Sequence, residues 1–242
     1  MATEFNREQF SQAYSDGIEG SYWNIARKKV ILHYIRKFKL NNILDVGCGR
    51  GLVTSYLHKA GLQITGADLG DPSPANLGSL KIYYNADALE LPESLRSTIE
   101  TITLFDVIEH VKDPALFLKN LSSKYPNLKS IVITVPARKE LWTNFDDYYG
   151  HFRRYTLQTV QKDAEDSGFQ VTYSRYFFHI LYILIRLNNL LVKQRDIDFK
   201  PPKGLLSNVV NRIMGAIFYL ETFIIPGKLL GSSIICICRK KQ

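Results

Sequence analysis

Cysteine is scarce in this chain of 242 residues, which carries only Cys48, Cys236 and Cys238. The number is odd and none of the three stands at the spacing of metal ligands, so we expect neither a disulfide framework nor a cysteine-bound zinc site. The polar N-terminal stretch MATEFNREQFSQAYSDG lacks an apolar segment, so we expect no secretory signal. Together these features indicate a cytoplasmic protein.

Net positive charge is nearly absent from the first 185 residues, which hold twenty-one Lys and Arg against twenty Asp and Glu. Residues 186–242 hold ten against three, so the formal charge of +8 belongs mainly to the C-terminal part of the chain. A protein that binds nucleic acid through its whole fold would carry a larger basic excess throughout. The uneven distribution therefore argues against a nucleic-acid partner.

Segments typical of strands and of helices alternate through most of the chain. The expected strands are 43–46, 62–69, 80–87, 99–111, 129–137, 168–178 and 231–240. The expected helices between them are 52–60, 93–98, 114–124 and 156–167. This alternation predicts a doubly wound, Rossmann-like α/β fold, with a mostly parallel seven-stranded sheet and helices on both faces.

A loop with three glycines follows the first expected strand, in ILDVGCGRG at residues 43–51. Gly47, Gly49 and Gly51 have the spacing G-x-G-x-G, whereas a dinucleotide-binding loop has G-x-G-x-x-G and a P-loop ends in G-K-[ST]. Leu52 stands where the dinucleotide pattern needs its third glycine, which disfavours a nicotinamide-dependent oxidoreductase. The loop still predicts a small ligand held close to the backbone beyond the carboxyl ends of the strands.

Three further motifs also follow expected strands. They are Asp68, NADALELP (85–92) and FDVIEHVKDP (105–114). With the glycine loop they resemble, in order, the motifs of class I S-adenosylmethionine-dependent methyltransferases. The stretch VPARKELWTNFDDYYGHFRRYT (135–156) narrows the resemblance to a subgroup with ubiquinone-pathway O-methyltransferases and type 11/23 methyltransferase domains. The resemblance implies an enzyme whose cofactor is S-adenosylmethionine.

The resemblance also implies which residues contact the cofactor. Asp68 would accept both ribose hydroxyls, and Asp45 would take the ammonium of the amino-acid end. Asp87 with Ala88 would meet the adenine. Cys48 is expected to be a small buried residue of the loop and not a nucleophile. The full expected set is Asp45, Gly47, Cys48, Gly49, Asp68, Leu69, Asp87, Ala88, Phe105 and Asp106.

The segment 106–110 resembles a loop of ubiquinone-pathway O-methyltransferases in which two acids and a histidine hold a divalent ion. Asp106, Glu109 and His110 would then bind Mg²⁺, with Asp standing where that family has Glu. Two other roles stay open. His110 could act as a general base, or Glu109 and His110 could form hydrogen bonds with the loop and line the methyl pocket. We expect catalysis from His110, Glu109 and His151, and no bound metal.

The run GHFRRY (150–155) carries residues expected to meet the methyl acceptor. Arg153 and Arg154 could grip a phosphate or a carboxylate of the acceptor. Equally, Arg154 could pair with Asp146 or Asp147 and fix the loop. The expected acceptor-binding set is Arg153, Arg154, Trp142 and Tyr149.

The regular alternation stops after residue 178, which suggests three parts. They are an N-terminal helical cap (1–40), a methyltransferase domain (41–178 with 231–242) and a basic amphipathic helical insertion (179–230). Tyr14 and Trp23 of the cap are expected to cover the cofactor.

The insertion is expected to contain two amphipathic helices, because apolar stretches at 177–193 and 205–225 are interrupted by polar residues. A bilayer span needs about 20 mostly apolar residues, so these helices are expected to lie on an anionic membrane surface through residues 177–230. The alternatives are a cap packed on its own domain and a homodimer interface.

We therefore expect a methyltransferase that acts on a small-molecule or lipid-linked acceptor, at an oxygen atom. The expected location is cytoplasmic, at the inner face of a membrane if the insertion binds lipid. The alternative is a non-catalytic cofactor-binding or membrane-associated scaffold of the same fold.

Overall fold

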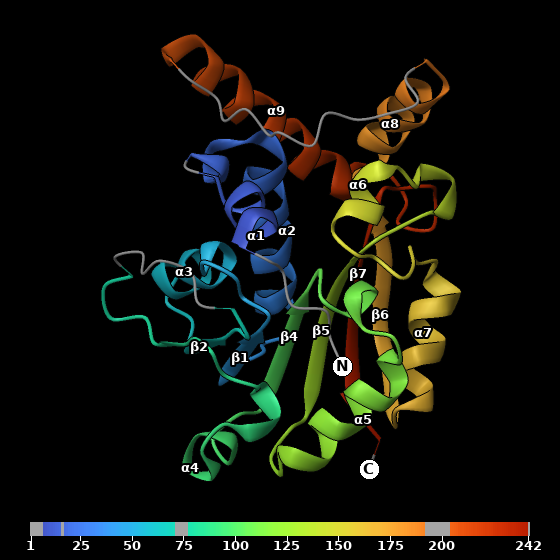
Figure 1. Cartoon of the computed structure of the whole chain (residues 1–242). Helices are drawn as coiled ribbons and strands as arrows, with labels where there is room; N and C mark the ends of the chain where they lie inside the picture. The colour runs from blue at the N-terminus through green and yellow to red at the C-terminus, as the bar shows by residue number, and fades with distance from the viewer. Residues whose placement is uncertain (1–6, 16, 71–76, 192–203, 242) are drawn as a thin grey trace.

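The structure is a computed structural model that describes residues 7–15, 17–70, 77–191 and 204–241. Seven strands form one sheet in the order β3-β2-β1-β4-β5-β7-β6 (Figure 1). The strands are β1 (Ile43–Val46), β2 (Ile64–Ala67), β3 (Ile82–Tyr83), β4 (Thr101–Phe105), β5 (Ser130–Pro136), β6 (Phe169–Phe177) and β7 (Ser233–Lys240). β7 is antiparallel to β5 and β6, and the other described pairs are parallel. The predicted Rossmann-like fold is confirmed.

Nine α-helices occur in the described residues (Figure 1). They are α1 (Arg7–Ala13), α2 (Tyr22–Lys37), α3 (Leu52–Lys59), α4 (Glu93–Arg96), α5 (Pro114–Lys124), α6 (Asn144–Tyr148), α7 (Leu157–Asp166), α8 (His179–Leu191) and α9 (Leu205–Ile224). Short 3₁₀ turns, η1 to η4, lie at Ile18–Gly20, Ala88–Glu90, Ile108–His110 and Lys139–Leu141.

The sheet separates two apolar cores, because side chains alternate between its faces along each strand. On β5, Ile131 and Ile133 belong to the core under α5 and α7, whereas Val132 belongs to the core under α2 and α3. On β7, Cys236 points to the first core and Ile235 to the second. Both faces are therefore buried, as a mostly parallel sheet requires.

Local capping fixes where α5 and α7 begin. The Asp113 side chain accepts a hydrogen bond from the backbone N–H of Leu116 at 3.0 Å, and Pro114 occupies the first helical turn. Thr156 accepts one from the N–H of Thr159 at 3.2 Å. Both starts match the sequence prediction, since caps of this kind depend on neighbouring residues alone.

All strands except β1 are shorter than predicted, and β3 and β4 differ most. β3 has two residues where the pattern predicted 80–87, and β4 ends at Phe105 where it predicted 99–111. Asp106 ends β4 because its backbone takes a left-handed conformation, with φ of 60°. The chain then turns through η3, which brings Glu109 and His110 back over the strand ends.

The helices α8 and α9 follow β6 and precede β7 along the chain, and they project from one end of the molecule, at the top of Figure 1. α9 packs against α2: a Cβ built on Gly215 would lie 2.6 Å from Cγ2 of Ile25. Within the described residues, neither α8 nor α9 nor any other helix has the length and apolar character to cross a membrane.

Candidate active site

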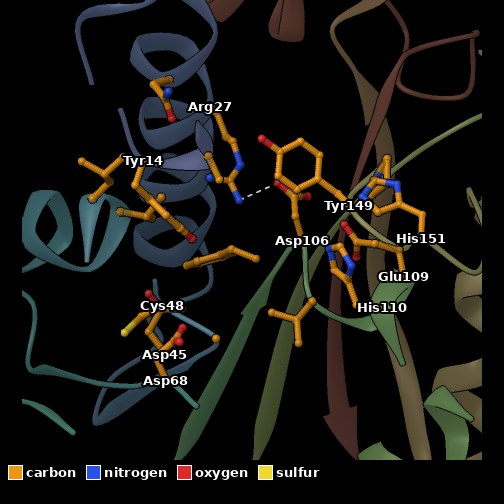
Figure 2. A pocket seen from close by; sticks show the side chains of 18 of the residues that line it. Tyr14, Arg27, Asp45, Cys48, Asp68, Asp106, Glu109, His110, Tyr149 and His151 are labelled. Atoms are coloured by element: carbon orange, nitrogen blue, oxygen red, sulfur yellow. Dashed lines mark ion pairs between the residues drawn. The ribbon is translucent and has the colours of Figure 1, made fainter. Parts of the chain in front are cut away.

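A cavity of about 530 Å³ lies at the carboxyl ends of β1, β2 and β4. The glycine loop and the ends of β2 and β4 form one side, and η3, the segment after β5 and α8 contribute the other. Figure 2 shows the two groups of polar side chains, with Asp45, Cys48 and Asp68 in one and Glu109, His110 and His151 in the other. Residues predicted for the cofactor and residues predicted for catalysis therefore share one cavity.

The glycine loop has no room for side chains on its cavity side. Gly47 and Gly49 have φ of 73° and 55°, a conformation that L side chains rarely adopt. A Cβ on Gly47 would lie 2.7 Å from Cγ2 of Val107. A Cβ on Gly49 would overlap the hydroxyl of Tyr14, which covers the loop from the N-terminal side. Gly49 itself is thus shielded from the cavity, whereas Gly47 lines it.

Asp68 is fixed at the end of β2 by two backbone groups. Its Oδ2 accepts a hydrogen bond from the N–H of Gly49 at 2.6 Å, and its Oδ1 accepts one from the N–H of Gly70 at 2.8 Å. A carboxylate has about four acceptor sites, so these two backbone donors alone do not fill it. The carboxylate lines the cavity, as an acceptor for a diol must.

Asp45 and Asp87 also line the cavity, and both accept hydrogen bonds from neighbouring protein groups. Asp45 is buried and accepts hydrogen bonds from the hydroxyls of Thr54 at 2.6 Å and Thr103 at 2.9 Å. Burial raises the pKa of Asp45 to about 6, although the two hydroxyls and Arg27 oppose the rise. Asp87 caps η2 by accepting from the N–H of Leu89 at 2.9 Å.

Leu69, Ala88, Phe105 and Asp106 complete the predicted cofactor set, and all four line the same cavity. These residues fit a ligand with a diol and a flat ring. Asp68 lies beside the glycine loop, and Asp87 lies at the end of the neighbouring strand. That these residues hold the cofactor stays a prediction.

Arg27 is a polar residue of the cavity that the sequence analysis missed. Its Nη2 lies 2.7 Å from Oδ2 of Asp106, and its guanidinium lies 4.9 Å from the ring centre of Trp23 (Figure 2). The sequence could have indicated its burial, because Arg27 stands three and four residues before Val30 and Ile31 and so shares the buried face of α2 with them. A cation on such a stripe signals a buried partner.

Glu109, His110 and His151 form a compact cluster whose potential ligand atoms all lie within 4.8 Å of one another. Neither carboxylate oxygen of Glu109 accepts a hydrogen bond from another described side chain. Burial raises the pKa of Glu109 well above its usual range, and the nearby Asp106 adds to the rise. Burial also lowers the pKa of His110 to about 4, helped by the neighbouring His151.

The magnesium set that the resemblance implies is not assembled here, because Asp106 pairs with Arg27. The remaining donors are one carboxylate and two imidazoles, a combination that Mg²⁺ does not favour. We therefore derive no metal-dependent step.

His151 is held by a buried carboxylate. Its Nδ1 lies 2.8 Å from Oδ1 of Asp146, and Arg154 donates two hydrogen bonds to the same carboxylate at 2.7 and 3.0 Å. Burial would raise the pKa of Asp146, but the hydrogen bonds from His151 and Arg154 outweigh it and lower the pKa to about 2. A neutral His151 that donates from Nδ1 carries its lone pair on Nε2.

The acceptor residues predicted from GHFRRY divide into two groups. Tyr149 and Arg154 line the cavity, but Arg154 is engaged by Asp146, one of the two pairings left open by the sequence. Arg153 donates to the backbone oxygen of Lys112, and Trp142 donates to Asp147. Neither Arg153 nor Trp142 lines the cavity, and their contacts with an acceptor stay predictions. Partners across the fold decide these orientations, and the sequence does not display them.

A family model described as a methyltransferase domain matches residues 7–174. The ubiquinone biosynthesis O-methyltransferase of Coxiella burnetii (strain RSA 493 / Nine Mile phase I) is 28% identical over 138 residues, which cover 50% of this chain and 59% of that protein. The protein of the same name from Sodalis glossinidius is 25% identical over 123 residues, covering 43% and 49%. The chain thus spans about half the length of these curated relatives.

Two solved structures share the fold. A SAM-dependent methyltransferase from Archaeoglobus fulgidus superposes with a TM-score of 0.52 at 20% identity, covering 88% of this chain and 94% of that one. The plantazolicin methyltransferase BpumL, solved in complex with SAH, gives 0.54 at 16% identity, covering 98% and 90%.

Proposed function

The chain belongs to the methyltransferase domain family, and on that premise we propose that it binds S-adenosylmethionine in this cavity and methylates an oxygen atom of an organic acceptor. One observation carries the proposal: Asp68 and Gly47 line the same cavity as His151. Asp146 does not line the cavity but holds His151 through a hydrogen bond. One side of the cavity has the groups that bind a nucleoside, and the other side has His151, the candidate general base.

Four residues would hold the cofactor. Asp68 accepts hydrogen bonds from its ribose hydroxyls, and Asp87 with Ala88 receives the adenine. Arg27 pairs with Asp106 through Nη2 and has further N–H groups that can donate to the cofactor carboxylate. When bound, S-adenosylmethionine supplies a methyl group on a positively charged sulfur, which a nucleophilic oxygen can take.

His151 is the proposed general base. Its Nε2 accepts the proton of the acceptor hydroxyl, while Asp146 fixes the ring and stabilises the imidazolium. His110 is a weaker choice, because its lowered pKa of about 4 means that it holds a proton poorly. An oxygen acceptor fits this arrangement, since a hydroxyl must lose its proton during methyl transfer. The relatives named as O-methyltransferases support the same choice.

The acceptor has an apolar or aromatic body. The cavity includes Phe145, Tyr149, Leu181 and Ile185 beside the polar cluster, and such side chains contact apolar ligands favourably. A small aromatic molecule and a lipid-linked one both satisfy this requirement.

Calorimetric titration with S-adenosylhomocysteine tests the cofactor site. Wild-type protein should bind, and Asp68→Asn should bind at least about tenfold more weakly, because a hydrogen bond to a charged group is lost. Asp166→Asn removes an exposed carboxylate of α7 and should leave the affinity unchanged. Well-folded wild-type protein that does not bind would refute the proposal.

A further inference from the structure

The outer face of α9 is apolar and exposed. The opposite face, with Gly215, Phe218 and Thr222, is buried against the body of the protein. The exposed stripe follows helical spacing, and its members are between 42% and 79% exposed. They are Leu206, Val210, Ile213, Ile217, Leu220 and Ile224. A helix that is apolar on both sides needs an apolar environment on both, and the described chain supplies only one.

α8 presents a second exposed stripe of the same kind. Its members are between 36% and 85% exposed, and they are Ile180, Ile183, Leu184, Leu187, Leu190 and Leu191. Leu181 and Ile185 of the same helix line the cavity. The apolar surface therefore continues from the outside of α8 to the wall of the candidate active site.

The two helices are joined at their base by a buried acid. Glu221 of α9 accepts hydrogen bonds from the backbone N–H groups of His179 at 2.7 Å and Ile180 at 2.9 Å, which begin α8. This link sets the direction in which α8 leaves the body of the protein. Both helices project from the same end of the molecule in Figure 1.

Exposed basic side chains lie on or next to the two helices. Arg186 on α8, Arg212 on α9 and Lys228 after α9 are exposed. Arg36 and Lys37 are exposed on α2, the helix that packs against α9. The one acid on α8 and α9 is Glu221, which is buried. A second copy of the chain would bring these cations together, whereas anionic lipid headgroups would pair with them.

We propose that the α8–α9 face, defined by these two exposed stripes, docks on a membrane that contains anionic lipids. The helices lie in the interface with their apolar side chains at the boundary of headgroups and acyl chains. An exposed face with twelve large apolar side chains is unusual on a protein that contacts only water. The proposal rests on this surface and stands independently of methyl transfer.

Sedimentation with vesicles tests the docking face. The vesicles contain either phosphatidylcholine alone or equal parts of phosphatidylcholine and phosphatidylglycerol. The test variants Leu187→Glu and Ile213→Glu place a charge at positions that are 54% and 55% exposed. The control is Leu116→Glu on α5, at a position 53% exposed on another part of the molecule. All three substitutions replace a similarly exposed leucine or isoleucine by glutamate.

The full chain should bind the mixed vesicles more strongly than phosphatidylcholine alone. Each test variant should weaken binding at least about tenfold, since a charge replaces a leucine or isoleucine side chain that the bilayer would bury. Leu116→Glu should bind like wild type. No binding to the mixed vesicles, or binding that both test variants retain, would overturn the proposal. So would a wild-type dimer in light scattering that the test variants convert to monomer, because a second copy would then occupy the face.

Discussion

At the scale of single residues, the Asp146–His151 pair is the feature on which the proposed chemistry depends. The Asn side chain of Asp146→Asn keeps the volume but loses the charge that stabilises an imidazolium. We expect the variant to reduce turnover by about 10²- to 10⁴-fold, the usual contribution of a general base. Release of S-adenosylhomocysteine, measured with the first acceptor that supports turnover, would show the loss. An unchanged rate would contradict the proposed role of Asp146 in supporting His151.

Affinity for S-adenosylhomocysteine provides the control for that experiment. Asp146 does not line the cavity itself and is not among the proposed cofactor contacts. Calorimetry should therefore give the wild-type affinity for Asp146→Asn. A large loss of affinity would mean that the substitution disturbs the cavity as a whole.

His110 makes stability depend on pH. Burial lowers its pKa from 6.5 to about 4, so in that interval the unfolded chain binds a proton that the folded chain does not. Its contribution is complete above the unfolded pKa and is lost as the pH falls through the folded pKa. Between about pH 7 and pH 4, wild type should lose up to about 3 kcal/mol more unfolding free energy than His110→Asn. Denaturant unfolding at both pH values measures this difference, and equal losses would contradict it.

The limits of prediction from sequence are also clearest at single residues. Asp68, Gly47 and the Asp113 cap were predicted because each depends on neighbours along the chain or on a recognisable motif. Arg27 and the partner of Arg154 depend on contacts between segments far apart in sequence. Arg153 donates to the backbone oxygen of Lys112, a contact that the sequence did not show, and its contact with the acceptor stays a prediction.

At the scale of elements, the α2–α9 contact fixes the base of the α8–α9 face. Gly215 allows this contact, because a Cβ there would lie 2.6 Å from Cγ2 of Ile25 and 3.2 Å from the backbone oxygen of Tyr22. Gly215→Leu keeps good helix propensity but overfills the contact, and should lower the free energy of unfolding by about 1–3 kcal/mol. Thermal or denaturant unfolding measures the change.

Ser207→Ala is the matched control on the same helix. It lies in the first turn of α9, away from the α2 contact, and should change the stability by no more than about 0.5 kcal/mol. If Gly215→Leu were as stable as Ser207→Ala, the close α2–α9 packing would be wrong.

The order and type of the main elements followed from the sequence, but the strand lengths did not, above all at β3 and β4. The pattern of β-branched and apolar residues continues past Phe105, so it predicted a longer β4. The left-handed backbone of Asp106 ends the strand, and its pairing with Arg27 from α2 is a tertiary contact that no local pattern contains. Backbone conformations of this kind often occur at functional sites.

At the scale of the whole molecule, the proposed cofactor site and the proposed docking face occupy separate surfaces. Leu187→Glu should keep the wild-type affinity for S-adenosylhomocysteine while losing vesicle binding. Asp68→Asn should show the opposite pattern. Calorimetry and vesicle sedimentation on the same two variants measure both properties. A variant that loses both would indicate that the two surfaces are coupled or that the fold is damaged, which circular dichroism would distinguish.

A crystal structure of the complex with S-adenosylhomocysteine tests the central claim most directly. The account predicts the ribose hydroxyls at the Asp68 carboxylate, the adenine beside Asp87 and Ala88, and the sulfur facing the side of the cavity that holds His151. A ligand bound elsewhere, or one whose ribose leaves Asp68 uncontacted, would contradict the account.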